Sequence, residues 1–395
     1  MRGNVMKRIF CLIAILLPLW SVAQVGTIWT KEYDGRCEAV AMMADGGFLI
    51  AGEIKHPQYF GNQNLLMRLD SNGDTLWTRT FGTVAEVDCS EVSDDYYGVT
   101  GRMTVSSAEI VRRAFANPDG SFVTLTDCYS ENAERCKCLT TWNDVGASAR
   151  RVPFCATGTN VIFDLNRTSN GQFVVLGSPD PYGTYGNRFF VMCVSLSGDT
   201  LNYWPYETTS DLHLHQMIKP CHDGGYVLAG SSPKSVVTRI DPQGNMLWTY
   251  QMEKSGGSIG DIAEAADDGF IVIGHMSRET VRKAAAVATK LDAEGALLWQ
   301  RSYGWDSEYR SRTLDVLDNG SLLIAGSFNR YEYARMFVMC TTGSGDSLWT
   351  ADVGRGELRA FIKTPDGGYL LVGSYAGARS FPQQKIVLAR TTPPE

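Results

Sequence analysis

Histidine is scarce in this sequence, and the common catalytic motifs are missing from it. Only five of the 395 residues are histidine, which leaves few arrangements for acid–base chemistry through imidazole. No Gly-x-Ser-x-Gly elbow, phosphate-binding loop or His-Glu-x-x-His pair occurs. The sequence therefore contains no motif that assigns a known activity.

Charged residues are also few, at 20%, and they leave a net charge of −7. This composition excludes a disordered chain and argues against a nucleic-acid footprint or a polybasic membrane patch. Apolar residues make up 44% of the chain, enough for a large core. The 40 glycines and 11% aromatics favour many short strands joined by tight turns.

Long apolar runs are absent after the first 23 residues, which have the organisation of a secretory signal. Lys7 and Arg8 precede the apolar segment Ile9–Trp20, and Ser21-Val22-Ala23 is a small-residue cleavage site. An uncleaved anchor is the alternative, but the run is shorter than the roughly 20 residues of a membrane span. We expect residues 1–23 to be removed and residues 24–395 to be secreted without a transmembrane segment, to the periplasm, the cell surface or the medium.

An internal repeat predicts the fold. Asp45–Gly52, with the sequence Asp-Gly-Gly-Phe-Leu-Ile-Ala-Gly, recurs closely at Asp223–Gly230 and Asp366–Gly373. Four weaker copies bring the number of units to seven: Asp94–Gly101, Asn170–Gly177, Asp267–Gly274 and Asn319–Gly326. The Asp-Gly and Asn-Gly steps indicate hairpin turns, because these residues accept positive φ.

A second motif follows each copy: an apolar strand, a turn and a strand with tryptophan, as in Leu65–Trp77. Ala114–Val123 and Val194–Trp204 are interpreted as degenerate copies of it. Each unit then contains four antiparallel strands. Seven such units of roughly 50 residues predict an all-β, seven-bladed β-propeller. One tryptophan per unit is explained by packing between blades.

The chain ends favour a closed propeller over an open solenoid. The last unit ends at Lys385–Arg390 without a tryptophan strand, whereas Thr27–Thr30 is a tryptophan strand with nothing before it. Pairing of the two segments would complete the seventh blade and remove the free sheet edges.

The cysteines suggest one irregular unit. Cys128, Cys136, Cys138 and Cys155 fall within a predicted insertion at about residues 127–159. This insertion is either a binding loop or simply a loop tied by disulfides, and both interpretations remain open. Cysteines 193 and 340 occupy equivalent third strands of distant blades, so we expect buried free thiols there.

The segment Leu69–Trp77 and the Asp-Gly-Gly-aromatic core resemble the repeats of secreted bacterial β-propellers, in the broad grouping that includes the pyrroloquinoline-quinone-like propellers and repeats of the Bacteroidetes type. The resemblance covers nearly the whole of residues 24–395. It implies the propeller fold, and its motifs are structural, so it implies no particular activity.

The first strands of the blades should line the central channel, where unlike residues occupy equivalent positions. Aligned on the Asp-Gly turn, one column contains Glu38, Val87, Phe163, Gln216, Gly260, Arg312 and Arg359, and the next contains Ala39, Asp88, Asp164, Met217, Asp261, Thr313 and Ala360. From these columns and the incoming loop we select ten candidate ligand-binding residues: Glu38, Asp88, Asp164, Gln216, Asp261, Arg312, Arg359, Trp305, Tyr309 and Arg310. The alternative is a water-filled channel whose charges pair with one another.

A metal site is not expected. His213 and His215 share one face of a strand, but Cys221-His222 should lie about 20 Å away at the far end of it. We expect no cofactor either.

The favoured function is a secreted, non-catalytic binding module for a polymer, glycan or protein, with no nucleic-acid partner. The alternative is an extracellular enzyme that acts on carbohydrate or a polyanion through Asp88, Asp164 and Asp261. Closely paired carboxylates beside aromatic residues would favour the enzyme, whereas salt-bridged or dispersed carboxylates would favour binding.

Overall fold

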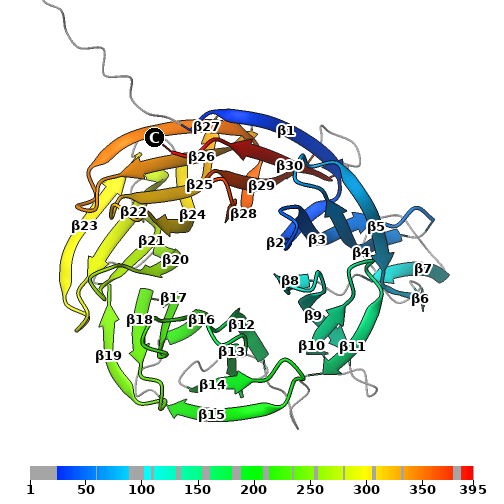
Figure 1. The fold of residues 1–395 in the computed structure, drawn as a ribbon, viewed down its shortest axis with the longest axis horizontal. Helices are drawn as coiled ribbons and strands as arrows, with labels where there is room; N and C mark the ends of the chain where they lie inside the picture. The colour runs from blue at the N-terminus through cyan, green and yellow to red at the C-terminus, as the bar shows by residue number, and fades with distance from the viewer. Residues whose placement is uncertain are drawn as a thin grey trace, which may run out of the picture.

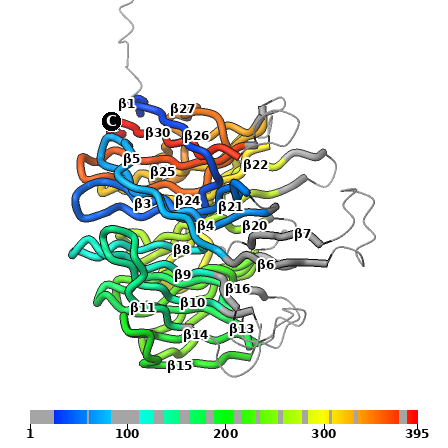
Figure 2. Tube along the Cα trace, turned by 90° about the vertical axis from the view of Figure 1, so that its right-hand side faces the viewer, coloured from blue at the N-terminus to red at the C-terminus, as the bar shows by residue number. Residues whose placement is uncertain are grey.

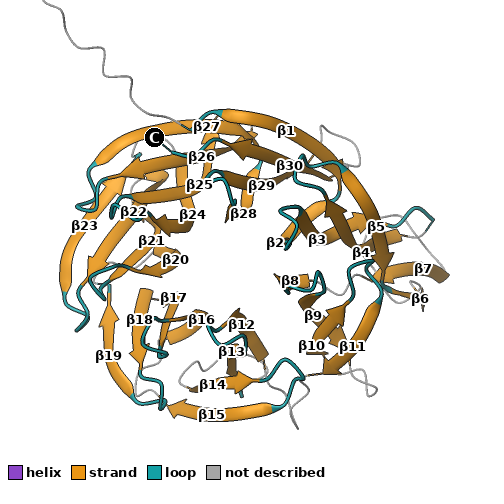
Figure 3. Cartoon of the chain, viewed as in Figure 1, coloured by secondary structure: helices purple, strands orange, loops and turns teal. Residues whose placement is uncertain are grey.

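Seven blades, each built on four antiparallel strands, surround a central axis in the computed structural model (Figures 1 and 3). The structure describes residues 25–394 except 59, 89–101, 108–110, 130–134, 154–160, 180–187, 208–212, 234, 253–256, 279–280, 305–307, 331–332 and 377–383. The first strand of each sheet lies nearest the axis and the fourth lies at the rim (Figure 1). The predicted seven-bladed propeller is therefore confirmed.

The blades are numbered in chain order, and in blades 1–6 the four strands follow one another in sequence from the axis outward. Blade 1 contains β2 (Arg36–Met42), β3 (Phe48–Lys55), β4 (Phe60–Leu69) and β5 (Thr75–Phe81). Blade 2 contains β8 (Val111–Ala116), β9 (Phe122–Tyr129), β10 (Arg135–Trp142) and β11 (Ser148–Pro153). Blade 3 contains β12 (Val161–Arg167), β13 (Phe173–Ser178), β14 (Arg188–Val194) and β15 (Thr200–Glu207).

The remaining blades follow the same plan. Blade 4 contains β16 (His213–Pro220), β17 (Tyr226–Pro233), β18 (Ser235–Ile240) and β19 (Met246–Gln251). Blade 5 contains β20 (Gly257–Glu264), β21 (Phe270–Arg278), β22 (Val281–Leu291) and β23 (Leu297–Tyr303). Blade 6 contains β24 (Glu308–Val316), β25 (Leu322–Arg330), β26 (Tyr333–Thr341) and β27 (Ser347–Arg355). Blade 7 contains β28 (Glu357–Lys363), β29 (Tyr369–Ala376), β30 (Gln384–Thr391) and, as its outer strand, β1 (Thr27–Asp34).

The core is divided among the interfaces between neighbouring blades. Seven clusters of buried apolar residues occur, and each joins two adjacent blades. The second and third strands supply most of these residues because both of their faces are covered, which explains their nearly continuous apolar sequences. The tight turns between strands one and two and between strands three and four lie at one end of the ring, the left-hand side of Figure 2.

In blades 1, 3, 4, 5 and 7 the tryptophan of the outer strand packs on a turn of the next blade. Trp248 donates its indole N–H to the Ala293 carbonyl at 2.8 Å and covers Gly295. Gly295 has a φ of +84°, and a Cβ there would lie 2.5 Å from the indole, so the turn needs glycine for both reasons. Blade 2 lacks an outer tryptophan, and Val152 covers Gly198 in its place. The interpretation of the periodic tryptophans as packing residues is confirmed.

Four blades also carry a charged clasp between the third strand and the first turn. The pairs are Arg68–Asp45, Arg239–Asp223, Lys290–Asp267 and Arg390–Asp366. In each pair the cation is nearly buried while the carboxylate is more than half exposed. The hydrogen bond from Arg390 lowers the pKa of Asp366 to about 2. The clasp thus fixes the turn that precedes each buried second strand.

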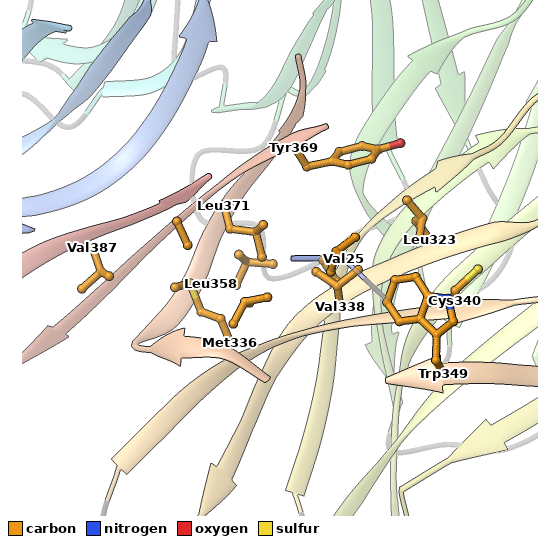
Figure 4. Packing of buried hydrophobic residues seen from close by; sticks show 13 residues of the cluster. Val25, Leu323, Met336, Val338, Cys340, Trp349, Leu358, Tyr369, Leu371 and Val387 are labelled. Atoms are coloured by element: carbon orange, nitrogen blue, oxygen red, sulfur yellow. The ribbon is translucent and has the colours of Figure 1, made fainter. Parts of the chain in front are cut away.

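The ring closes as the chain ends predict. β1 pairs antiparallel with β30, with Trp29 opposite Arg390 and Thr30 opposite Ala389. Gly26 and Thr392 exchange hydrogen bonds just beyond this ladder. Val25 is buried in the cluster between blades 6 and 7, next to Trp349 (Figure 4). The N-terminal segment therefore completes a sheet and also part of the core.

The prediction for blade 2 was wrong in two respects. Its first turn is formed by residues 117–121 rather than by Asp94–Gly101, which lies outside the described residues. Residues 127–159 are not an insertion, because they contain β10 and β11, which complete the blade. Ala114–Val123 was interpreted as the hairpin between the third and fourth strands of a blade, but it joins the first and second strands of blade 2. The turn residues of the two kinds of hairpin are similar, which explains the error.

The extra chain lies between β5 and β8 instead. It contains β6 (Thr83–Asp88) and β7 (Arg102–Ser107), a hairpin that pairs with β4 only through two parallel positions at the outer side of blade 1 (Figure 1). Within the described parts of the other blades this hairpin has no counterpart.

The two third-strand cysteines are buried free thiols on β14 and β26, as predicted. Of the other group, Cys128 and Cys136 are paired positions in the backbone ladder of β9 and β10. Cys138 is disulfide-bonded, and Cys155 lies outside the described residues. The full pairing of these cysteines stays a prediction. The signal segment also lies outside the described residues, and within them no helix is long and apolar enough to cross a membrane.

Candidate functional site

The innermost strand of every blade contains a β-bulge at the same position. In blade 1, Cys37 pairs with Gly52 and Ala39 with Ala51, so Glu38 has no partner across the ladder. The residues skipped in this way are Glu38, Arg112, Phe163, Gln216, Gly260, Arg312 and Arg359. Bulges redirect side chains and are frequent beside functional sites. Six of these seven residues belong to the column that the sequence alignment singles out.

A cavity of about 560 Å³ lies between these inner strands. It falls within the volume range of small-molecule sites, about 300–1,000 Å³. Its charged lining consists of Glu38, Arg113, Lys219, Asp261, Arg310, Arg312, Glu357 and Arg359. Val40, Met217 and Phe361 add apolar surface. The cavity therefore combines a few apolar walls with many charges.

Five of the ten candidate residues line this cavity: Glu38, Asp261, Arg310, Arg312 and Arg359. The other five do not. Asp164 is buried behind the lining, and Gln216 is exposed on β16 outside it. Asp88 lies in the peripheral β6–β7 hairpin, Trp305 falls outside the described residues, and Tyr309 packs against Phe328 and Phe337 in the core. The expectation that Asp88 and Tyr309 belong to the channel mouth was wrong.

Asp164 and Asp261 have the same structural role in two different blades. Asp164 bonds Arg113 of the preceding blade at 2.7 Å and accepts the backbone N–H of Ile218 in the following blade at 3.1 Å. Burial raises the pKa of Asp164, and the guanidinium of Arg113 opposes that shift.

Asp261 repeats this arrangement two blades further round the ring. It bonds Lys219 of the preceding blade at 2.5 Å and accepts the N–H of Leu314 of the following blade at 3.0 Å. Each carboxylate therefore links three consecutive blades, and both of its oxygens are used in these contacts.

The remaining acids of the cavity are also paired. Arg36 bonds Oε1 of Glu38 at 2.8 Å, and Arg359 bonds Oε2 of Glu357 at 2.8 Å. On β24, Arg310 bonds Oε1 of Glu308 at 3.0 Å. These pairs match the interpretation in which the charges of the channel neutralise one another.

Arg312 is the exception. Within the described part of the chain, its guanidinium makes no hydrogen bond or ion pair although it lines the cavity. Burial and the neighbouring guanidinium of Arg359 lower the pKa of Arg312, while the carboxylates of Glu357 and Glu38 act in the opposite direction. The Nε of Arg359 is buried without a hydrogen-bond partner. Positive charge is therefore in excess where blades 6 and 7 meet the channel.

A serine and a histidine face each other on the wall of blade 5. Ser258 Oγ lies 2.9 Å from His275 Nδ1, and both residues line the cavity. Burial and the positive charge of Arg310 lower the pKa of His275, so the imidazole is neutral at pH 7. Glu308 bonds Arg310 and Asn329 instead of this ring. No described carboxylate orients this pair, and the two side chains offer the cavity hydrogen-bonding groups.

The other histidines do not form a metal site within the described residues. His213 and His215 lie on β16, where they pair with Pro233 and Gly230 of β17. Cys221 is buried, and His222 lies 3.4 Å from Glu264 at the end of the next blade's inner strand.

Sequence reasoning missed Arg113, Lys219, Ser258 and His275. Arg113 was missed because the first turn of blade 2 was assigned to Asp94–Gly101 instead of the Asp119-Gly120 step. His275 had a usable signal: it follows the glycine that ends the repeat motif, where four of the other blades have serine.

Comparisons with known proteins identify the fold and no family. No family model matches the sequence, and no curated protein is similar to it. The polysaccharide lyase Uly1 is 12% identical, with 90% of each chain covered and a TM-score of 0.53. Sqt1 from Chaetomium thermophilum is 8% identical over 94% of this chain and all of its own, with a TM-score of 0.50. A protein of unknown function from Bacteroides caccae is 13% identical over 78% of this chain and 94% of its own, with a TM-score of 0.46. At these identities the likeness is one of fold alone, and the fold is the seven-bladed propeller.

Proposed function

We propose that the protein is a secreted binding module that holds an anionic group of a glycan, polymer or protein in its central cavity. The observation that carries this proposal is the unpaired guanidinium of Arg312, which lines a cavity whose other charges are paired. Guanidinium groups bind carboxylates and other oxyanions through several parallel hydrogen bonds. An arginine left without a partner beside a second arginine therefore favours an anionic ligand.

The state of the carboxylates supports binding over hydrolysis. Glycoside hydrolysis needs two carboxyl groups that can reach the substrate, one as an acid and one as a base or nucleophile. Here Asp164 and Asp261 are held by cations and by backbone N–H groups of other blades. Glu38 and Glu357 line the cavity, but each is paired with an arginine, which favours the ionised carboxylate over the protonated acid that hydrolysis needs. Asp88 lies on a peripheral hairpin. The fold that this chain shares with a polysaccharide lyase is no evidence for lyase chemistry at 12% identity.

A ligand screen with matched variants tests the proposal. The purified chain is probed on arrays of glycans and polyanions, alongside the double variant Arg312→Ala/Arg359→Ala. We expect the double variant to lose binding while its thermal stability stays nearly unchanged. Arg188→Ala is the control, because Arg188 pairs with Glu207 at the exposed surface of blade 3. A ligand that binds the double variant with unchanged affinity would remove this arginine pair from the site.

Export is the second part of the proposal, and it rests on the signal-like residues 1–23. Expression in a bacterial host with secretion, followed by N-terminal sequencing, should give Gln24 as the first residue. Retention of an intact N-terminus in the cytosol would contradict it.

A further inference from the structure

Among the residues that the structure describes, the charges around the cavity leave one positive charge in excess. Six cations belong to this group: Arg36, Arg113, Lys219, Arg310, Arg312 and Arg359. Five carboxylates oppose them: Glu38, Asp164, Asp261, Glu308 and Glu357. Every carboxylate has its own cation, and His275 adds no charge at pH 7 because its pKa is lowered. The single excess charge is that of Arg312.

We infer that the ligand of the cavity is an acidic sugar unit with one negative charge, held through that charge by Arg312 with Arg359 beside it. This inference rests on the proposed function and specifies its ligand. A monoanion neutralises the excess charge. A dianion leaves one negative charge uncompensated beside the carboxylates of Glu38 and Glu357, which repel it. A neutral sugar leaves the guanidinium without a partner.

The rest of the lining suits hydroxyl groups. The described contacts use Oε1 of Glu38 and Oε2 of Glu357, so the second oxygen of each carboxylate can accept a hydrogen bond from a ligand hydroxyl. The hydroxyl of Ser258 and the neutral ring of His275 can both donate and accept on the opposite wall. Anionic ligands without hydroxyl groups would leave these polar groups unused.

The apolar part of the lining suits the C–H face of a sugar ring. Val40, Met217 and Phe361 come from blades 1, 4 and 7, and they interrupt the polar lining of the cavity. Phe361 is held in place because its ring stacks on Tyr369 with centroids 4.4 Å apart. A ring with one charged group, several hydroxyl groups and an apolar face therefore matches all three parts of the site.

The acid group has two sources, a carboxylate and a sulfate ester, and both carry one charge. Four sugars that differ only at carbon 6 separate these cases: D-glucuronate, D-glucose 6-sulfate, D-glucose 6-phosphate and D-glucose. Their binding to the full chain is measured at pH 7.5 and constant ionic strength by saturation-transfer NMR and calorimetry. We expect the better of the two monoanions to bind at least tenfold more tightly than glucose and than the phosphate, which is mostly dianionic at this pH. The order of the two monoanions identifies the acid group.

Variants connect the effect to the site. Arg312→Gln keeps hydrogen-bond donors but removes the charge, so it should reduce the preference for the monoanion over glucose at least tenfold. Arg188→Gln should leave the preference unchanged.

The inference would be overturned if glucose bound as tightly as the better monoanion, or if glucose 6-phosphate bound more tightly than either monoanion. Neither result would contradict the proposed binding function. Failure of all four sugars, together with an Arg312-dependent ligand of another class on the arrays, would also overturn this inference alone. Failure of the proposed function is recognised separately, by array ligands that do not depend on Arg312 and Arg359.

Discussion

Replacement of Arg113 by methionine should make the stability of the protein depend more strongly on pH. Arg113 is the cation beside Asp164, whose side chain is only 1% exposed, whereas that of Arg113 is 43% exposed. Methionine keeps much of the aliphatic packing but leaves the buried carboxylate without its cation. Loss of one partner of a buried pair costs about 3–5 kcal/mol when the other stays charged.

Protonation of Asp164 limits that cost. The unfolded carboxyl group has a pKa near 3.9, so protonation at pH 7 costs about 4 kcal/mol, at 1.36 kcal/mol per pH unit. At pH 5 the same step costs only about 1.5 kcal/mol. Because burial already raises the pKa of Asp164 in the wild type, removal of Arg113 raises it further. A raised folded pKa contributes stability that is present at low pH and lost as pH rises through it. The free energy of unfolding of Arg113→Met should therefore be about 2–3 kcal/mol higher at pH 5 than at pH 7.

The assay is urea and thermal unfolding of the wild type and Arg113→Met from pH 5 to 8. The double variant Arg113→Met/Asp164→Asn should be more stable than the single variant at pH 7 and nearly independent of pH, since its buried group cannot ionise. Arg188→Met should stay within about 0.5 kcal/mol of wild type because its ion pair is exposed. A single variant that loses stability equally at pH 5 and pH 8 would refute the electrostatic reasoning and indicate lost packing.

Three other perturbations test the frame of the ring. Deletion of residues 24–32 should lower the melting temperature by several degrees or more, because blade 7 loses its outer strand and an edge is exposed; an unchanged melting temperature would contradict closure. Gly295→Ala should destabilise by about 1–3 kcal/mol in denaturant titrations, since the added methyl group meets Trp248 and the positive φ disfavours it; combination with Trp248→Ala should remove the steric part of that loss. Asp366→Asn should be less stable than wild type at neutral pH, and this difference in the free energy of unfolding should shrink as pH falls from about 4 to 2, because Arg390 holds the pKa of Asp366 at about 2. A difference that grows in acid would show that the Arg390–Asp366 pair is not its cause.

The parts of the fold that sequence reasoning predicted are those the repeat encodes locally. Each Asp-Gly turn fixes a hairpin by its backbone conformation. The N-terminal strand that contains Trp29 has no partner in its own part of the sequence, and the last unit lacks a fourth strand, so the two were predicted to pair, as β1 and β30 do. Blade 2 was misassigned because its first turn, around Asp119-Gly120, is followed by Ser121 where the close copies have a second glycine. A turn that matches the repeat motif only weakly cannot be assigned to the first or the second hairpin of a blade unless the strand pairing is known.

The channel residues were only half predictable for a different reason. Residues such as Glu38 and Arg312 could be found by aligning the seven repeats on the first turn, because they occupy the same unpaired bulge position in every blade. The pairing of Asp164 with Arg113 connects different blades, so it depends on the three-dimensional packing of neighbouring first strands. Whether a charged residue serves structure or ligand is decided by such partners, and a single sequence does not contain them.

The contact between an outer strand and the next turn has a geometric consequence. Blades 1, 3, 4, 5 and 7 present a tryptophan to a turn of the following blade, and blade 2 presents Val152 at the same place, so the contact is head-to-tail, as in a cyclic oligomer of identical subunits. Such contacts form a closed ring only when the rotation between neighbours divides the full circle. Trp29 reaches Gly73 of blade 1 from the strand that completes blade 7, so the circle closes after seven rotations. The number of blades is therefore a property of the interface angle, and an eighth repeat inserted by duplication would require all of the interfaces to adopt a new angle together.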